Sequence, residues 1–167
     1  MTDRPIHFGV TPFEDIAHLT GLEYIRGICD GRYAAPTIGR TMGFRMAEVA
    51  EGRVVFEGAP SAEVMNPIGT VHGGYAATML DSALACAVHT ICPAGHASTS
   101  VNLQVSFIRP IAPDIGTVRC EGVVVHPGRQ LATAEARLTG PDGKLLATGT
   151  QTCSVFRIPS TPPAATG

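Results

Sequence analysis

One carboxylate stands alone in the most apolar part of the sequence. Asp81 is the only formally charged residue between Glu63 and Arg109. Its neighbours at helical spacing include Ala77 and Ala85, which are small and would leave space beside the carboxylate. Burying an unpaired carboxylate is costly, so such a group normally has a partner. Asp81 is therefore either a structural carboxylate that bonds to a nearby turn or a catalytic carboxylate beside a substrate slot.

A second set of residues with chemical potential lies shortly before Asp81. Gly73 and Gly74 begin the apolar segment, His72 precedes them, and Asn66 opens the loop before a proline. A helix that starts at the glycine pair has free backbone N–H groups, which together with the helix dipole can hold an anion or a developing oxyanion. Each residue alone also fits turn chemistry, with Asn66 as a turn former and His72 as a hydrogen-bonded scaffold residue. The combination at one helix start favours a functional site.

The composition excludes several classes of protein. The chain has 167 residues, which is the length of one domain, and 44% of them are hydrophobic. Its 12 Lys+Arg and 14 Asp+Glu residues are balanced, whereas a nucleic-acid-binding protein needs a basic excess. Trp is absent and aromatic residues make up only 5%, which argues against base-stacking platforms. We expect a globular protein with no nucleic-acid partner.

Cysteine usage and the most apolar stretch indicate the compartment. The five cysteines are odd in number and scattered, which is typical of free thiols in a reducing compartment. The first residues contain no apolar signal-peptide core. Residues 73–92 are about as long as a membrane span, but Asp81 near the centre would cost roughly 2.5–3.5 kcal/mol on insertion. We therefore expect a cytoplasmic protein with a buried helix and no membrane partner.

The elements that must position these residues follow from local patterns. Residues 11–30 predict one or two short helices, with capping boxes at Thr11/Glu14 and Thr20/Glu23. Ala, Met and Leu predict a long helix from Gly73, which the Pro93–Gly95 turn ends. Period-two alternation and β-rich composition predict strands over residues 43–49, 53–64, 101–107, 118–125, 131–138 and 145–156.

This order predicts an α+β hotdog fold. One helix that is apolar nearly all round must be covered on most sides, and a curved antiparallel sheet wrapped around it would do so. Short turns join the last three strands, as in a meander. We expect an N-terminal helical extension over residues 1–35, the hotdog domain over 36–157, and a flexible C-terminal tail over 158–167.

Several segments together resemble the PaaI-like hotdog acyl-CoA thioesterases. They are Asn66-Pro-Ile-Gly-Thr-Val-His72-Gly73-Gly74, then Thr78-Met-Leu-Asp81-Ser-Ala, Val105-Ser-Phe-Ile-Arg109-Pro110 and His126-Pro-Gly-Arg129. The resemblance runs from about residue 38 to residue 155, and the mutual spacing of Asn, His-Gly-Gly and Asp is its most specific part. The first 35 residues lie outside it.

The resemblance implies hydrolysis of acyl-CoA thioesters and a role for each motif residue. Asp81 would be the catalytic carboxylate, as nucleophile or as base on water, and Gly73 would offer its N–H to the thioester carbonyl. Asn66 would position water or the carbonyl, and His72 would orient the loop and the thioester. A hydroxyl at the start of the next strand would assist; Ser98, Thr99 and Ser100 are the candidates, and Thr99 is preferred.

The resemblance also implies how substrate and subunits are arranged. Gly74, Arg109 and Arg129 would bind substrate, with the two arginines on the phosphates of the CoA nucleotide; ordinary exposed arginine is the alternative for both. The active site would lie across a homodimer interface, so that Asp81 faces Asn66 and His72 of the partner chain, and the dimer could double into a homotetramer. No cofactor is expected, because CoA is part of the substrate.

Other functions account for some of the same residues. Cys86, His89, Cys92 and His96 have metal-like spacing, but Pro93 ends the helix before His96, so no metal is expected. A non-catalytic acyl-CoA-binding hotdog module and a hotdog hydratase or dehydratase remain alternatives. A thioester has a good leaving group, so a carboxylate and an oxyanion hole suffice, and the sequence has no G-x-S-x-G motif. The sequence leaves the acyl group open.

Overall fold

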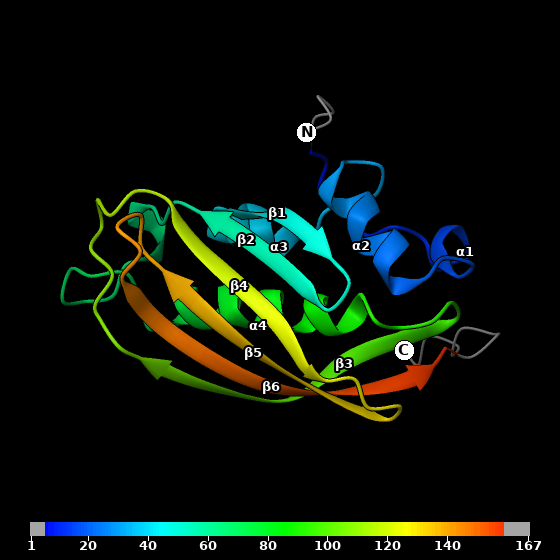
Figure 1. Ribbon diagram of the computed structural model, residues 1–167. Helices are drawn as coiled ribbons and strands as arrows, with labels where there is room; N and C mark the ends of the chain where they lie inside the picture. Colours follow the sequence, from blue (N-terminus) through cyan, green and yellow to red (C-terminus); the bar gives the residue numbers. More distant parts are fainter. Residues whose placement is uncertain (1–5, 159–167) are drawn as a thin grey trace, which may run out of the picture.

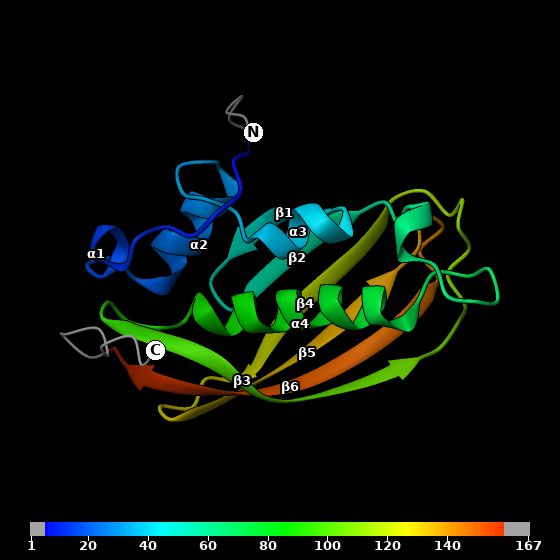
Figure 2. The same ribbon diagram turned by 180° about the vertical axis from the view of Figure 1, so that it is seen from behind.

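A curved antiparallel sheet of six strands wraps around one long helix, as the hotdog prediction requires (Figures 1 and 2). The computed structural model describes residues 6–158, so most of the predicted flexible tail lies outside the described residues. The strand order across the sheet is β1-β2-β4-β5-β6-β3. In chain order the elements are α1 (Phe13–Ile16), α2 (Gly21–Cys29), α3 (Thr37–Met42), β1 (Phe44–Ala50), β2 (Arg53–Gly58), the 3₁₀ helix η1 (Ala62–Val64), α4 (Gly73–His89), β3 (His96–Phe107), β4 (Val118–His126), β5 (Leu131–Thr139) and β6 (Leu145–Arg157).

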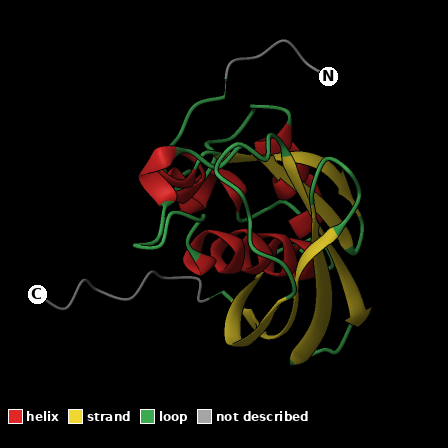
Figure 3. Cartoon of the chain, turned by 90° about the vertical axis from the view of Figure 1, so that its left-hand side faces the viewer, coloured by secondary structure: helices red, strands yellow, loops and turns green. Residues whose placement is uncertain are grey.

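Helix α4 is the centre of the hydrophobic core. Its buried residues come from nearly every turn and are Tyr75, Ala76, Met79, Leu80, Ala83, Leu84, Ala87 and Val88. It packs against β2, β3, β4, β5 and β6, and the view along the molecule shows it inside the curve of the sheet (Figure 3). Strand β4 approaches it so closely that a Cβ on Gly122 would lie 2.5 Å from the carbonyl oxygen of Ala83. Glycine is therefore required where β4 crosses the helix.

The strands largely follow the predicted ranges, with two differences. Strand β2 ends at Gly58 instead of continuing to Val64, because Pro60 follows and cannot donate to a ladder. Residues 62–64 form η1 instead, where the Ser61 hydroxyl accepts a hydrogen bond from the N–H of Glu63. Strand β3 begins at His96, five residues before the predicted start, and its pairing with β6 is interrupted by a bulge between Ser100 and Asn102.

The N-terminal segment forms three short helices, of which α2 packs against β1 and α4, and α3 packs against β1 (Figure 2). The predicted capping box of Thr20 and Glu23 is confirmed, with both reciprocal hydrogen bonds present. The predicted cap at Thr11 is wrong, because its hydroxyl accepts a hydrogen bond from the N–H of Ala34 at 3.2 Å instead. Helix α3 was not predicted, since two of its six residues are threonines and one is glycine.

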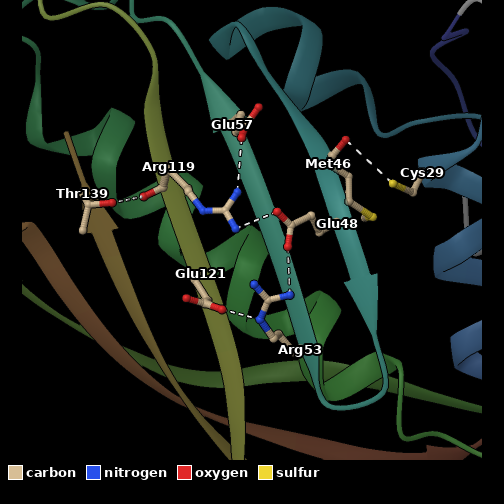
Figure 4. A network of polar contacts seen from close by, with 8 residues as sticks. All are labelled: Cys29, Met46, Glu48, Arg53, Glu57, Arg119, Glu121 and Thr139. Carbon is tan, nitrogen blue, oxygen red and sulfur yellow. Dashed lines mark hydrogen bonds and ion pairs between the residues drawn. The ribbon is translucent and has the colours of Figure 1, made fainter. Parts of the chain in front are cut away.

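The face of the sheet that points away from α4 carries a network of ion pairs across β1, β2 and β4 (Figure 4). Glu48 lies between two arginines, 3.0 Å from Arg53 and 2.8 Å from Arg119. Arg53 also pairs with Glu121, and Arg119 with Glu57 at 3.2 Å. The hydrogen bonds from Arg119 and Arg53 lower the pKa of Glu48 below its ordinary value. The network ties the three strands together on their solvent side.

One edge of the sheet and one face of the helix are left open. Strand β3 is an edge strand, and the side chains of Val101 and Phe107 are each 60% exposed. The half-buried face of α4 beside it carries mainly small residues, including Ala77 and Ala85. Within residues 6–158, no helix has the length and apolar character needed to cross a membrane.

Candidate active site

Asp81 lies midway along α4 and is anchored from the sheet. Its Oδ1 accepts hydrogen bonds from Ser100 Oγ, at 3.2 Å, and from Gln151 Nε2. Gln151 is only 2% exposed, and its Oε1 accepts a hydrogen bond from Cys153 Sγ at 3.3 Å, which fixes the orientation of the amide. Within residues 6–158, Oδ2 of Asp81 accepts no hydrogen bond. The carboxylate is thus held through one oxygen, and the other has no hydrogen-bond donor among the described residues.

The hydroxyl that reaches Asp81 is that of Ser100, which corrects the preference for Thr99. Ser98 contacts Nδ1 of His89 at 3.3 Å, so Ser98 and Ser100 both point toward α4 and Thr99 points to the opposite face. Unbroken alternation back from Leu103 would have placed Thr99 toward the helix. The bulge after Ser100 inserts one residue and reverses the alternation.

Gln151 is a functional candidate that sequence reasoning missed. It lies in a strand of alternating threonines, a pattern that indicates only an ordinary β-strand face. The available signal was its register: the neighbours at alternate positions, Gly149 and Cys153, are small and apolar and point toward the helix. A lone glutamine in such a row is buried, and a buried amide needs hydrogen-bond partners.

The start of α4 presents one free N–H group. His72 is the N-cap, and its Nδ1 accepts a hydrogen bond from the N–H of Gly74 at 2.8 Å. The N–H of Gly74 is therefore occupied, contrary to the expectation that it is free for substrate. Nothing among residues 6–158 accepts from the N–H of Gly73. The ring of Phe107 lies against Gly73, where an added Cβ would be 3.1 Å from Cζ, so a side chain at Gly73 would crowd this ring.

Asn66 shapes the loop that leads to this helix start. Its Oδ1 accepts from the N–H groups of Ile68 and Thr70, both at 3.1 Å, and its Nδ2 donates to Thr70 Oγ1 at 2.7 Å. These contacts close the turn over residues 66–70, as expected for a turn-forming asparagine. One hydrogen of the side-chain amide has no acceptor in the described part of the chain.

A single chain does not bring the two halves of the predicted site together. Gly73 and Asp81 are eight residues apart on α4, which at about 1.5 Å per residue is roughly 12 Å along the axis. Asn66 and His72 lie before Gly73, beyond the same end of the helix. One chain therefore carries an anchored carboxylate at the middle of α4 and a free N–H group at its start, and the two are well separated.

The two predicted phosphate contacts lie at opposite ends of the sheet. Arg109 follows β3, donates from Nη1 to the carbonyl oxygen of Leu145 at 2.6 Å, and lines a groove of about 340 Å³ together with His72 and Gly73. Arg129 is exposed in the turn between β4 and β5, beside the far end of β6. About ten residues of β6 separate the two ends, roughly 33 Å of strand. One chain cannot place both guanidinium groups on the same phosphate.

The cysteines and histidines near the end of α4 have separate surroundings. His89 packs edge-on against Tyr24, and burial lowers its pKa. Burial, with a smaller contribution from Asp81, raises the pKa of the Cys86 thiol to about 12. Cys92 donates from Sγ to the carbonyl oxygen of Val88 at 3.7 Å. Residues 6–158 contain no group of three or more His, Cys, Asp or Glu side chains arranged to hold a metal ion.

Comparisons with known proteins show which proteins the chain is similar to. Residues 68–147 match the thioesterase superfamily. Acyl-coenzyme A thioesterase 13 of Homo sapiens is 29% identical over 134 residues, which is 78% of this chain and 90% of that protein.

Solved structures show the same likeness. A phenylacetic acid degradation-related protein of Ralstonia eutropha JMP134 superposes with a TM-score of 0.72 at 29% identity, over 78% of this chain and 98% of that one. A variant of the phenylacetic acid degradation protein PaaI from Thermus thermophilus gives 0.64 at 29% identity, over 73% and 99%. The PaaI protein of E. coli shares the fold, with a TM-score of 0.70 at 21% identity, over 84% and 97%.

Proposed function

Because the chain belongs to the thioesterase superfamily, as a PaaI-like hotdog thioester hydrolase, we propose that its substrates are acyl-coenzyme A thioesters, which it converts to a free acid and coenzyme A. The observation that carries this proposal is Asp81, anchored through Oδ1 by Ser100 and Gln151 with Oδ2 left free. Acyl-coenzyme A thioesterase 13 supplies the substrate class by its name.

The reaction needs two groups that act on opposite sides of the thioester carbonyl. Asp81 takes a proton from the attacking water through Oδ2, or attacks the carbonyl itself; both roles require a free carboxylate oxygen. The N–H of Gly73, at the positive end of α4, donates to the oxyanion that develops on the carbonyl oxygen. Collapse of the tetrahedral intermediate releases the thiolate of coenzyme A, which needs little further assistance. Where Asp81 itself attacks, water then hydrolyses the acyl–Asp81 anhydride to the free acid and the carboxylate.

These two groups meet across a homodimer in our proposal. The roughly 12 Å between Gly73 and Asp81 in one chain supports a site in which each residue faces the other residue of the partner chain. The open edge of β3, with exposed Val101 and Phe107, and the small residues on the open face of α4 provide a surface for a second copy. Pairing of two such dimers would give the homotetramer expected from the resemblance.

Arg109 is our candidate for the nucleotide end of the substrate. It lines the same groove as His72 and Gly73, so it lies on the half-site that holds the thioester carbonyl. A guanidinium group suits phosphate oxygens in charge and geometry. Arg129 reaches the same nucleotide only if it comes from the other chain of the dimer.

The first experiment is a thiol-release assay over a panel of acyl-CoA substrates with Asp81→Asn and, as a matched control, Asp114→Asn, which changes an exposed loop aspartate. Asp81→Asn should lower kcat by about 10²- to 10⁴-fold, the range for a lost base or nucleophile. Its melting temperature should not fall, because the neutral amide oxygen can still accept from Ser100 and Gln151. No thiol release from any acyl-CoA by the folded protein would reject the substrate class, and a low melting temperature with retained activity would make Asp81 structural.

A mixing experiment tests the two-chain site. A chain with Asp81→Asn and a chain with Asn66→Ala should each be weak, while a reassociated equal mixture recovers about a quarter of wild-type activity per total site. Half of the dimers are then mixed, and each mixed dimer holds one intact site of two. Absence of recovery, with subunit exchange shown by mass spectrometry, would place both residues in the same chain's site.

A further inference from the structure

An apolar cavity lies beneath the N-terminal helices, between them, β1 and α4. Its volume is about 80 Å³. Ile28 and Cys29 at the end of α2 form one wall, and Phe44 and Met46 of β1 form another. Among the described residues that line it, only Arg45 is charged, and it is exposed and so keeps its charge at the rim. A cavity of this kind offers few polar partners for water and favours apolar occupants.

The floor of this cavity is formed by α4, on a face next to that of Asp81, which does not itself line the cavity. Ser82, which lines the cavity, follows Asp81 in sequence, and Cys86 lines it one turn further along. The Ser82 hydroxyl donates to the carbonyl oxygen of Thr78 at 2.8 Å, so its polar group is satisfied within the helix. The charge of Asp81 contributes to the raised pKa of the Cys86 thiol, in agreement with their proximity.

The remaining wall comes from a part of the chain that precedes the superfamily match. Ala35, Ile38 and Gly39, between α2 and β1, line the cavity together with the residues of α2. The match to the thioesterase superfamily begins at residue 68. This wall is therefore outside the segment that the superfamily match covers.

We propose that this cavity holds the apolar end of the acyl group, so that residues 6–39 select acyl chains with a tail that extends well beyond an acetyl group. The proposal rests on the proposed function, since the carbonyl of the same substrate lies at Asp81. Cys86 is five residues from Asp81, about 7.5 Å along the helix axis, so a short acyl group ends before it fills the cavity. Each methylene group that the cavity buries should raise kcat/KM about fourfold.

Cys29 offers a substitution that fills the cavity and a control that keeps its volume. Cys29→Leu replaces the sulfur with three carbon atoms, a net gain of two heavy atoms in the wall. Cys29→Ser is nearly isosteric and keeps a donor for the carbonyl oxygen of Met46, which the thiol contacts at 3.9 Å. With octanoyl-CoA, Cys29→Leu should lower kcat/KM by about 15- to 60-fold, corresponding to two or three excluded methylene groups. With acetyl-CoA, both variants should stay within about threefold of wild type.

Ile38→Ala provides the opposite change at a half-exposed position that tolerates truncation. It enlarges the cavity and should shift the preferred chain length upward, with kcat/KM for decanoyl-CoA relative to octanoyl-CoA raised about fourfold. This variant keeps the test valid if Cys29→Leu does not fold. A flat profile from acetyl-CoA to decanoyl-CoA in the wild type, or an equal loss on all substrates in Cys29→Leu with Ile38→Ala unchanged, would overturn the proposal.

Binding of octanoate, measured by calorimetry, separates this proposal from the proposed function. Octanoate should bind wild type and Cys29→Ser and should bind Cys29→Leu at least tenfold more weakly. If no acyl-CoA is hydrolysed and this binding pattern is nevertheless observed, the cavity does hold an apolar tail and the assigned substrate class fails. If acyl-CoA substrates are hydrolysed and octanoate binds all three proteins equally, the cavity assignment fails alone.

Discussion

Replacement of Gly122 by alanine should weaken the packing of the sheet against α4 and destabilise the fold. The new Cβ would lie 2.5 Å from the carbonyl oxygen and 2.6 Å from the carbonyl carbon of Ala83. An ordinary contact begins near 3.4 Å, so strand and helix must separate by about 0.9 Å. The obstacle is helix backbone, which cannot rotate aside as a side chain can. We expect the upper end of the usual cost of overpacking, about 3 kcal/mol.

The assay is thermal unfolding, with Gly149→Ala as the matched control. In a domain of this size, about 3 kcal/mol lowers the melting temperature by roughly 6–12 °C. Gly149 also faces α4, but its Cβ would meet the Cδ1 end of Leu84 at 3.3 Å, and this flexible side chain can move. Gly149→Ala should therefore stay within about 3 °C of wild type. Equal melting temperatures for the two variants would refute the close approach of β4 to the helix backbone.

Three further perturbations test other parts of the structure. Arg109→Ala should raise KM for acyl-CoA about tenfold and leave kcat within about twofold, because phosphate binding is common to ground and transition states; an equal fall in kcat would exclude a simple binding role. A thiol reagent at pH 8 should label Cys86 only on unfolding, because burial raises its pKa to about 12; rapid labelling of the folded protein would contradict this. Glu48→Gln should lower the melting temperature at pH 7. The ion pairs lower the pKa of Glu48 below its ordinary 4.5, so its stabilisation of the folded protein is present above pH 4.5 and is lost as pH falls through the lowered value. The difference in melting temperature between Glu48→Gln and wild type should therefore vanish in acid. A difference that persists there would contradict the ion-pair network.

The fold was predictable where the signals are local. The helix from Gly73 and the three final strands follow from composition, alternation and turns that a few neighbouring residues determine. Helix α3 escaped prediction because its six residues have weak helix propensity and are stabilised by packing against β1. Strand β2 ends early because Pro60 cannot donate a hydrogen bond to the ladder. The β-rich composition continues beyond Pro60, so composition alone predicts a longer strand.

The candidate site was predictable in its residue types but not in its contacts. Asp81 stood out because it is a lone charge in an apolar segment, yet its partner Gln151 lies 70 positions away. Only the sheet register brings the two together. Whether Thr99 or Ser100 points toward Asp81 depends on a bulge in β3 that no local sequence pattern predicts. The use of the Gly74 N–H by His72 likewise depends on a side-chain rotamer rather than on spacing.

The strand order has a consequence for how the chain is made. The two edge strands, β1 and β3, and the interior strand β2 come from residues 44–107, whereas the other interior strands, β4, β5 and β6, come from residues 118–157. Strand β3 finds its only partner within the described chain in β6, the last strand to be synthesised. During translation from the N-terminus, the apolar surface of α4 is thus completed before most of its cover exists. Until β4, β5 and β6 have been made, α4 lacks most of the strands that cover its apolar surface in the folded protein.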